Sequence, residues 1–130
     1  MPESSATRSV LARADGEARR HGWLGTEHLL LALVEGRESA STLLAESGVA
    51  TDDLRSEIDA LNATNATGLS PGRATPSPHA NHALAIARER GGAKETTPEH
   101  VLLGILDVRS LAFSILERRG VDIAGLRKRL

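Results

Sequence analysis

The chain contains an internal duplication, and this feature limits its possible folds more than any other. The segment Leu24–Val34 reads Leu-Gly-Thr-Glu-His-Leu-Leu-Leu-Ala-Leu-Val, and Thr96–Leu106 reads Thr-Thr-Pro-Glu-His-Val-Leu-Leu-Gly-Ile-Leu. The two motif histidines, His28 and His100, are 72 positions apart, and the same offset aligns apolar pairs and a Gly-Val pair further along the chain. The sequence therefore predicts a fold in which one unit occurs twice.

The spacing of apolar residues predicts helices. Aromatic residues make up only 2% of the chain, so its core must come from aliphatic side chains, mainly Leu and Ala, which suit helices better than sheets. In the first expected helix, Val10, Ala14 and Ala18 recur every four positions. The helix that begins at Gly25 or Thr26 has an apolar face too wide for a surface helix, so we expect it to be central. Caps, prolines and glycines predict helices over about 5–20, 26–35, 38–47, 51–61, 78–90, 98–106, 110–119 and 123–130.

A segment rich in Asn, Thr, Gly, Ser and Pro separates the two units. Residues 62–77 have few side chains that a core could bury, so we expect them to form a linker. The predicted architecture is all-α, with eight helices in two four-helix repeats related by a pseudo-twofold axis. We expect one domain over residues 1–130, with repeat one at about 4–61 and repeat two at about 78–130.

Composition and missing motifs exclude several classes of function. The formal net charge of −1 creates no overall field that attracts nucleic acid or an anionic membrane. The chain has no cysteine, no signal peptide and no apolar run long enough to span a bilayer, which predicts a cytoplasmic protein. A phosphate-binding G-x-x-x-x-G-K-[ST] loop and a G-x-S-x-G elbow are both absent, so we expect no catalytic residues, no cofactor and no enzyme. His79 and His82 lack a third ligand nearby, so we expect no metal site.

The duplicated motif resembles a known family. The Thr-Glu-His-Leu-Leu-Leu-Ala-Leu pattern follows an Ala-striped helix and precedes a Leu-Leu-x-x-x-Gly-Val turn. Over roughly residues 4–130 this arrangement is similar to the Clp repeat, the amino-terminal domain of ClpA- and ClpC-type AAA+ unfoldases. The resemblance implies a non-catalytic module that binds adaptors, degradation substrates or proteins marked by phosphoarginine. We expect a monomer that acts with a ClpC-type ATPase, as a stand-alone adaptor or decoy or as part of a longer chain.

The same resemblance implies two ligand-binding helix starts. In the family, the glutamate of each motif pairs with the guanidinium of phosphoarginine, which corresponds to Glu27 and Glu99 here. Thr26 and Thr97 stand at the same helix starts. A carboxylate can hold a guanidinium through two parallel hydrogen bonds, and the N–H groups of a helix start can hold the phosphate. The alternative is that both glutamates only complement the helix dipoles.

Two further interpretations remain open at this stage. His28 and His100 precede equivalent apolar runs, so we expect a shared packing or hydrogen-bonding role for them. The alternative function is a small helical DNA-binding regulator, because short helices joined by glycine turns can mimic a helix-turn-helix. A recognition helix would be rich in Arg, Lys, Asn and Gln, whereas the motif helices here are apolar. Protein binding is therefore the favoured prediction.

Overall fold

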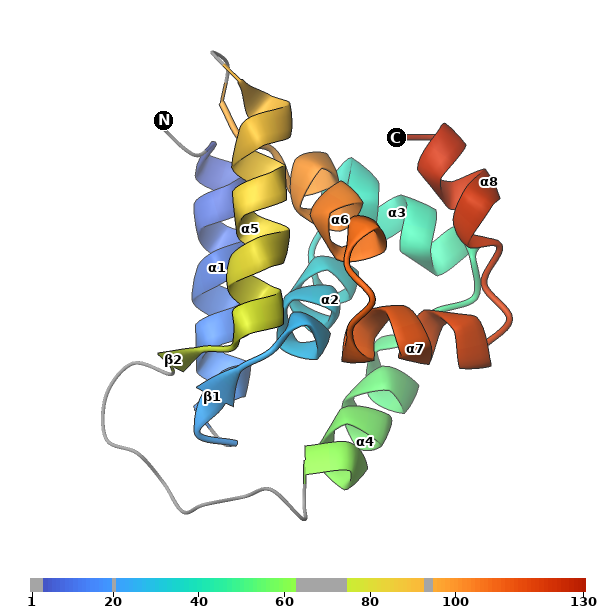
Figure 1. Cartoon of the computed structure of the whole chain (residues 1–130). Coiled ribbons are helices and arrows are strands. Elements are labelled where there is room, and N and C mark those ends of the chain that lie inside the picture. Colours follow the sequence, from blue (N-terminus) through green and yellow to red (C-terminus); the bar gives the residue numbers. More distant parts are fainter. Residues whose placement is uncertain (1–3, 20, 63–74, 93–94) are drawn as a thin grey trace.

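The computed structural model describes residues 4–19, 21–62, 75–92 and 95–130, and the fold over these ranges is helical (Figure 1). The eight-helix, all-α prediction is confirmed, with one addition, a pair of very short strands. In chain order the elements are α1 (Ser5–Ala18), β1 (Trp23–Leu24), α2 (Thr26–Glu35), α3 (Ser39–Glu46), α4 (Thr51–Asn62), β2 (Thr75–Pro76), α5 (Pro78–Gly91), α6 (Pro98–Asp107), α7 (Leu111–Arg118) and α8 (Ile123–Lys128).

Local side-chain chemistry determines where these helices begin and end. Ser4 and Ser77 are the N-cap residues of α1 and α5, and each hydroxyl oxygen accepts the N–H of the residue three positions on, at 3.1 Å. Gly48 and Gly120 follow α3 and α7 with φ angles of 90° and 76°. Because only glycine adopts this left-handed conformation without strain, the two equivalent glycines end equivalent helices.

The motif helix α2 lies at the centre of the molecule. Its residues from Thr26 to Leu33 are all buried, and it contacts α1, α3, α4, α5, α6 and α7. Figure 1 shows α2 enclosed by these elements. The most extensive helix pairings are α1 with α2 in repeat one and α5 with α6 in repeat two, so the same pair recurs. The predicted central position of this helix is therefore confirmed.

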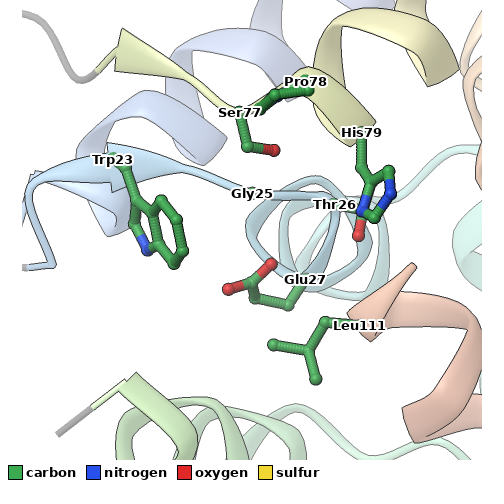
Figure 2. A pocket seen from close by; sticks show the side chains of 8 residues that line it. All are labelled: Trp23, Gly25, Thr26, Glu27, Ser77, Pro78, His79 and Leu111. Atoms are coloured by element: carbon green, nitrogen blue, oxygen red, sulfur yellow. The ribbon is translucent and has the colours of Figure 1, made fainter. Parts of the chain in front are cut away.

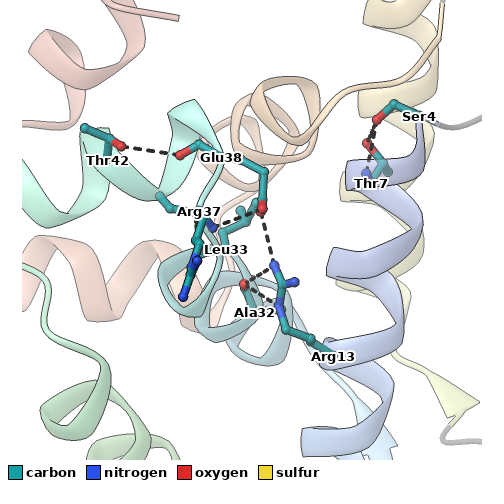
Figure 3. A network of polar contacts seen from close by, with 9 residues as sticks. Ser4, Thr7, Arg13, Ala32, Leu33, Arg37, Glu38 and Thr42 are labelled. Atoms are coloured by element: carbon teal, nitrogen blue, oxygen red, sulfur yellow. Dashed lines mark hydrogen bonds and ion pairs between the residues drawn. The ribbon is translucent and has the colours of Figure 1, made fainter.

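Polar contacts fix α1 to the far end of α2 (Figure 3). The guanidinium of Arg13 donates through Nη2 to the carbonyl oxygen of Ala32 and to Oε1 of Glu38, each at 3.1 Å. Glu38 precedes α3, so one side chain connects three consecutive helices of repeat one. Because the carbonyl groups at the end of a helix lack intrahelical donors, Arg13 also satisfies part of the end of α2.

The predicted linker is wrong at both of its ends. Asn62 is the last residue of α4 and is only 1% exposed. At the other end, Thr75 and Pro76 form β2, which pairs in parallel with Trp23 and Leu24 of β1. Residues 63–74 of the expected linker lie outside the described residues. The strand pairing brings the start of α5 next to the start of α2, and this contact builds the site described below.

Candidate functional site

A pocket of about 250 Å³ lies where three helices begin (Figure 2). The β1–β2 pairing is extended by the N–H of Ser77, which donates to the carbonyl oxygen of Leu24 at 2.8 Å and holds two of these helix starts together. Helix starts carry partial positive charge that attracts anionic groups. At the start of α5, however, Pro78 has no N–H. The N–H groups of Ala80 in α5 and Ala112 in α7 already donate to the hydroxyl oxygens of Ser77 and Thr26. Its lining residues are Trp23 of β1, Gly25, Thr26 and Glu27 at the start of α2, Ser77, Pro78 and His79 at the start of α5, and Leu111 at the start of α7.

Glu27 places a carboxylate inside this pocket. Its side chain is only 3% exposed, and Oε2 accepts a hydrogen bond from Nδ2 of Asn62 at 3.2 Å. Figure 2 shows the carboxylate directed toward the side of the pocket that Trp23 closes. Across the described residues, no basic side chain forms an ion pair with Glu27. A buried carboxylate without a cation is unfavourable, so the pocket is suited to a ligand that brings positive charge.

Asn62 holds both the carboxylate and the indole ring of the pocket. Its Oδ1 accepts from Nε1 of Trp23 at 2.9 Å, while Nδ2 donates to Glu27 and to the carbonyl oxygen of Ile58. Trp23 is 41% exposed and is the one large apolar side chain exposed among the described residues. Neither residue was predicted as part of a site, because Asn62 falls within the expected linker and Trp23 had no expected role.

A buried chain of hydrogen bonds supports the same helix start. The N–H of Gly25 donates to Nδ1 of His28 at 2.9 Å, Nε2 of His28 lies 2.8 Å from Nδ1 of His21, and Nε2 of His21 lies 3.1 Å from Oδ1 of Asp59. A backbone amide can only donate, so Nδ1 of His28 accepts and the proton of a neutral His28 ring is on Nε2. Nε2 of His28 then donates to Nδ1 of His21, and Nε2 of His21 donates to Oδ1 of Asp59. The chain therefore ties α4 to the start of α2. Sequence analysis singled out His28 but not His21.

The hydroxyl of Thr26 joins α2 to α7. It donates to Oγ of Ser110 at 2.7 Å and accepts the N–H of Ala112 at 3.2 Å. Thr26 also lines the pocket, and its hydroxyl already makes these two contacts. The hydroxyl of Thr26 therefore has no further proton to donate to a ligand.

The equivalent helix start in repeat two has a different surrounding. The N–H of Thr97 donates to Nδ1 of His100 at 2.9 Å, the same bond that His28 makes in repeat one. Glu99, however, is only half-buried and lies outside the pocket at α2. Pro98 occupies the first helical position and has no N–H to offer. The structure therefore does not bring Glu99 and Thr97 together with the residues of the α2 pocket.

The other candidate positions carry no further site. His79 and His82 are both exposed at the start of α5, and only His79 lines the pocket. Among the described residues, no group of three His, Cys, Asp or Glu side chains could hold a metal ion. A search of the same residues finds no helix that is long and apolar enough to cross a bilayer.

Two plant chaperone proteins are similar to this chain in sequence. The chain is 31% identical over 125 residues to the chloroplastic chaperone protein ClpC of Pisum sativum and to the chloroplastic chaperone protein ClpC1 of Arabidopsis thaliana. Each alignment covers 91% of this chain but only 13% of the relative, so the chain corresponds to a small part of those proteins.

Solved structures share the fold. The N-terminal domain of Hsp104 from Candida albicans superimposes with a TM-score of 0.78 at 15% identity, covering 99% of this chain and 89% of that one. The N-terminal domain of the caseinolytic protease associated chaperone ClpD from Arabidopsis thaliana gives 0.75 at 20% identity, covering 97% and 92%. A sequence model described as the Clp repeat (R) N-terminal domain matches residues 4–94. The chain therefore belongs to the Clp repeat N-terminal domain family.

Proposed function

We propose that this chain is a non-catalytic protein-binding module that recognises adaptors or degradation substrates for a Clp-type unfoldase. Its membership of the Clp repeat family and its similarity to the chaperone proteins ClpC and ClpC1 support this function. The proposal includes a module that serves a ClpC-type ATPase within a longer chain and one that acts separately as a monomeric adaptor or decoy. The absence of cysteine from the sequence fits a reducing compartment such as the cytoplasm.

We further propose that the α2 pocket binds phosphoarginine on a marked protein. The observation that carries this proposal is the buried carboxylate of Glu27, which has no cation partner among the described residues and lies beside three helix starts. The guanidinium would pair with Glu27 through two parallel hydrogen bonds and lie against the exposed face of Trp23. The phosphate would accept hydrogen bonds from N–H groups at the helix starts.

This arrangement supports one phosphoarginine pocket rather than two. Glu27 is buried and lies beside the starts of α5 and α7, whereas Glu99 is only half-buried and lines none of this pocket. A ligand that carries both a cation and an anion matches the α2 pocket, because the carboxylate of Glu27 attracts the cation and the helix starts attract the anion. Arginine offers only the cation and phosphoserine only the phosphate, so each would satisfy half of the site.

Isothermal titration calorimetry with phosphoarginine tests the proposal, with arginine and phosphoserine as control ligands. We expect saturable binding of phosphoarginine with one ligand per chain and no comparable binding of either control. Glu27→Gln keeps the shape of the side chain but removes its charge, and should lower the affinity by about tenfold or more, since hydrogen bonds to charged groups contribute about 1.5–3 kcal/mol. Glu99→Gln is the matched control and should bind like wild type.

Three results would separate the phosphoarginine proposal from the broader one. No heat at millimolar phosphoarginine, or equal losses in Glu27→Gln and Glu99→Gln, would refute the pocket assignment. Circular dichroism of both variants shows whether a loss comes from unfolding instead. A pull-down of Clp adaptors and a ClpC-type ATPase with the wild-type chain tests protein binding independently of the pocket.

The DNA-binding alternative gains no support from the fold. A recognition helix must present one face to the major groove. In α2 every residue from Thr26 to Leu33 is buried. In α6, six of its ten residues are buried, and Arg and Lys are absent from the helix. Neither motif helix offers a polar surface that could contact DNA bases.

A further inference from the structure

A second hollow, of about 490 Å³, lies between the end of α6, the start of α7 and α8. It shares no residue with the α2 pocket. Leu106 and Phe113 form its apolar base and are only 2% and 8% exposed, whereas Ile123 is partly exposed and Ala124 exposed. The full lining is Leu106, Asp107, Arg109, Phe113, Ile123, Ala124, Arg127 and Lys128. The hollow thus combines apolar side chains with three cationic ones.

Positive charge is concentrated here although the whole chain has a net charge of −1. Asp107 is the only acidic residue in the lining, and it is already paired with Arg90 at 2.9 Å and with Arg127. Arg109 is exposed and its guanidinium carbon lies 4.7 Å from the centroid of the Phe113 ring. Within the described ranges, no carboxylate forms an ion pair with Arg109 or Lys128.

The equivalent ion pair in repeat one has an additional partner of the opposite charge. At the offset of 72 residues, Arg127 corresponds to Arg55 and Asp107 to Glu35, and this ion pair occurs in both repeats. In repeat one a second acid, Glu17, also pairs with Arg55, so one cation lies between two carboxylates. In repeat two the second partner is a cation, Arg90. The pair itself is neutral in both repeats, but its additional partner is an acid, Glu17, in repeat one and a cation, Arg90, in repeat two.

A smaller hollow of about 370 Å³ adjoins the first at Asp107 and is lined by Ile86, Glu89 and Arg90 of α5. The two hollows share Asp107 and together extend from α5 to α8. A surface whose lining comes from α5, α6, α7 and α8 suits an extended peptide better than a compact small molecule. Because Glu89 lies at the α5 end, the excess of positive charge is at the α7–α8 end.

We propose that these two joined hollows, the α5–α8 groove, dock a linear acidic peptide segment of a partner protein. An aliphatic or aromatic side chain of the peptide fits beside Phe113, and flanking carboxylates meet Arg109 and Lys128. Asp107 holds Arg127 in place through an ion pair, so the cation is positioned before the peptide arrives. Complementary charge also speeds association and selects acidic partners over basic ones. The proposal does not depend on phosphoarginine binding at α2.

Chemical-shift mapping by NMR tests the groove on the intact chain. The probe is a capped hexapeptide with two central leucines and two aspartates on each side. One control peptide replaces the aspartates by lysines, and the other replaces the leucines by serines. We expect saturable shifts of the amide resonances of Arg109, Phe113 and Lys128 with the acidic leucine peptide only.

A pair of variants provides the second part of the test. Arg109→Ala/Lys128→Ala removes two exposed cations and should weaken binding by roughly three- to tenfold, with a smaller salt dependence. Arg37→Ala is the matched control, because Arg37 is exposed, lies 72 positions before Arg109 and does not line the groove. No saturation at millimolar peptide, equal shifts with the serine peptide, or equal loss in Arg37→Ala would overturn the proposal.

Discussion

Gly104 lies where α6 approaches the backbone of α5, and replacing it with alanine should destabilise the fold. A Cβ atom placed on Gly104 would overlap the carbonyl oxygen of Ala83 and lie 3.0 Å from its carbonyl carbon. Both are backbone atoms, so no change of side-chain rotamer can relieve the overlap. The two helices must move apart, and α5 and α6 form the most extensive helix contact in the structure.

Two opposing effects decide the size of the change. Alanine favours a helix over glycine by about 1 kcal/mol, whereas overpacking a core costs about 1–3 kcal/mol. Because the overlap at Gly104 involves rigid backbone, we take the upper half of that range and expect a net loss of about 1–2 kcal/mol. Gly16 is the matched control: it lies inside α1 with nothing within 4 Å of a Cβ atom. Gly16→Ala should stabilise the protein by about 0.5–1 kcal/mol.

Urea unfolding followed by far-ultraviolet circular dichroism measures both variants. With a urea dependence of about 2 kcal/mol per molar, Gly104→Ala should lower the midpoint by about 0.5–1 M and Gly16→Ala should raise it by about 0.3–0.5 M. A midpoint of Gly104→Ala equal to or above that of wild type would refute the close-approach argument. The equivalent residue in repeat one is Ala32, which is fully buried, so the constraint belongs to the α5–α6 crossing and not to the motif.

Three further changes test the site and the groove, each by urea unfolding. Asn62→Ala should cost about 1–3 kcal/mol, because it leaves the indole N–H of Trp23 and a buried carboxylate without their partner. His21→Ala should cost a similar amount, because Nε2 of the buried His28 loses the acceptor for its proton. His82 is exposed, so His82→Ala should change stability by less than about 0.5 kcal/mol. Equal effects of the two histidine variants would contradict the hydrogen-bond chain. Burial raises the pKa of Asp107, but hydrogen bonds from two arginines outweigh it, so this pKa lies below its ordinary value. A carboxyl whose pKa is lower in the folded state stabilises the protein at pH values above its pKa in the unfolded state. Asp107→Asn should therefore be less stable than wild type at neutral pH, and the difference should shrink as the pH falls below about 4.

The helices could be predicted from the sequence because their signals are local. A serine three residues before an amide that it caps, as at Ser4 and Ser77, lies within one helical turn of its partner. The glycines that end α3 and α7 act through their own φ angles. Because the unit is duplicated, the signals at a helix boundary in one repeat could be compared with those in the other repeat. For these reasons the number, order and approximate ends of the helices followed from the residues alone.

The pocket could not be predicted because its contacts join residues far apart in the chain. The strand pairing links Trp23 to Thr75. A strand of two residues is too short to show the alternation of apolar and polar side chains by which strands are recognised, and its proline argues against a strand. Asn62 continues into a run of Asn, Thr, Gly and Ser that is typical of linkers, yet it is the last buried residue of α4. Its role depends on Glu27, which is 35 positions away.

The two repeats have the same helix start but different neighbouring residues, and these neighbours determine how buried each glutamate is. His28 and His100 make the same bond to the backbone three residues before them. Only the start of α2, however, receives Asn62 from α4 and the beginning of α5 through the strand pairing. Glu99 has the same motif position as Glu27 without these neighbours, so its carboxylate stays half in solvent, where water can stabilise its charge. A buried carboxylate attracts a cationic ligand far more strongly than a solvated one. Counting motifs would therefore predict two equal sites, whereas we propose a single site at Glu27 because only its carboxylate is buried among these neighbours.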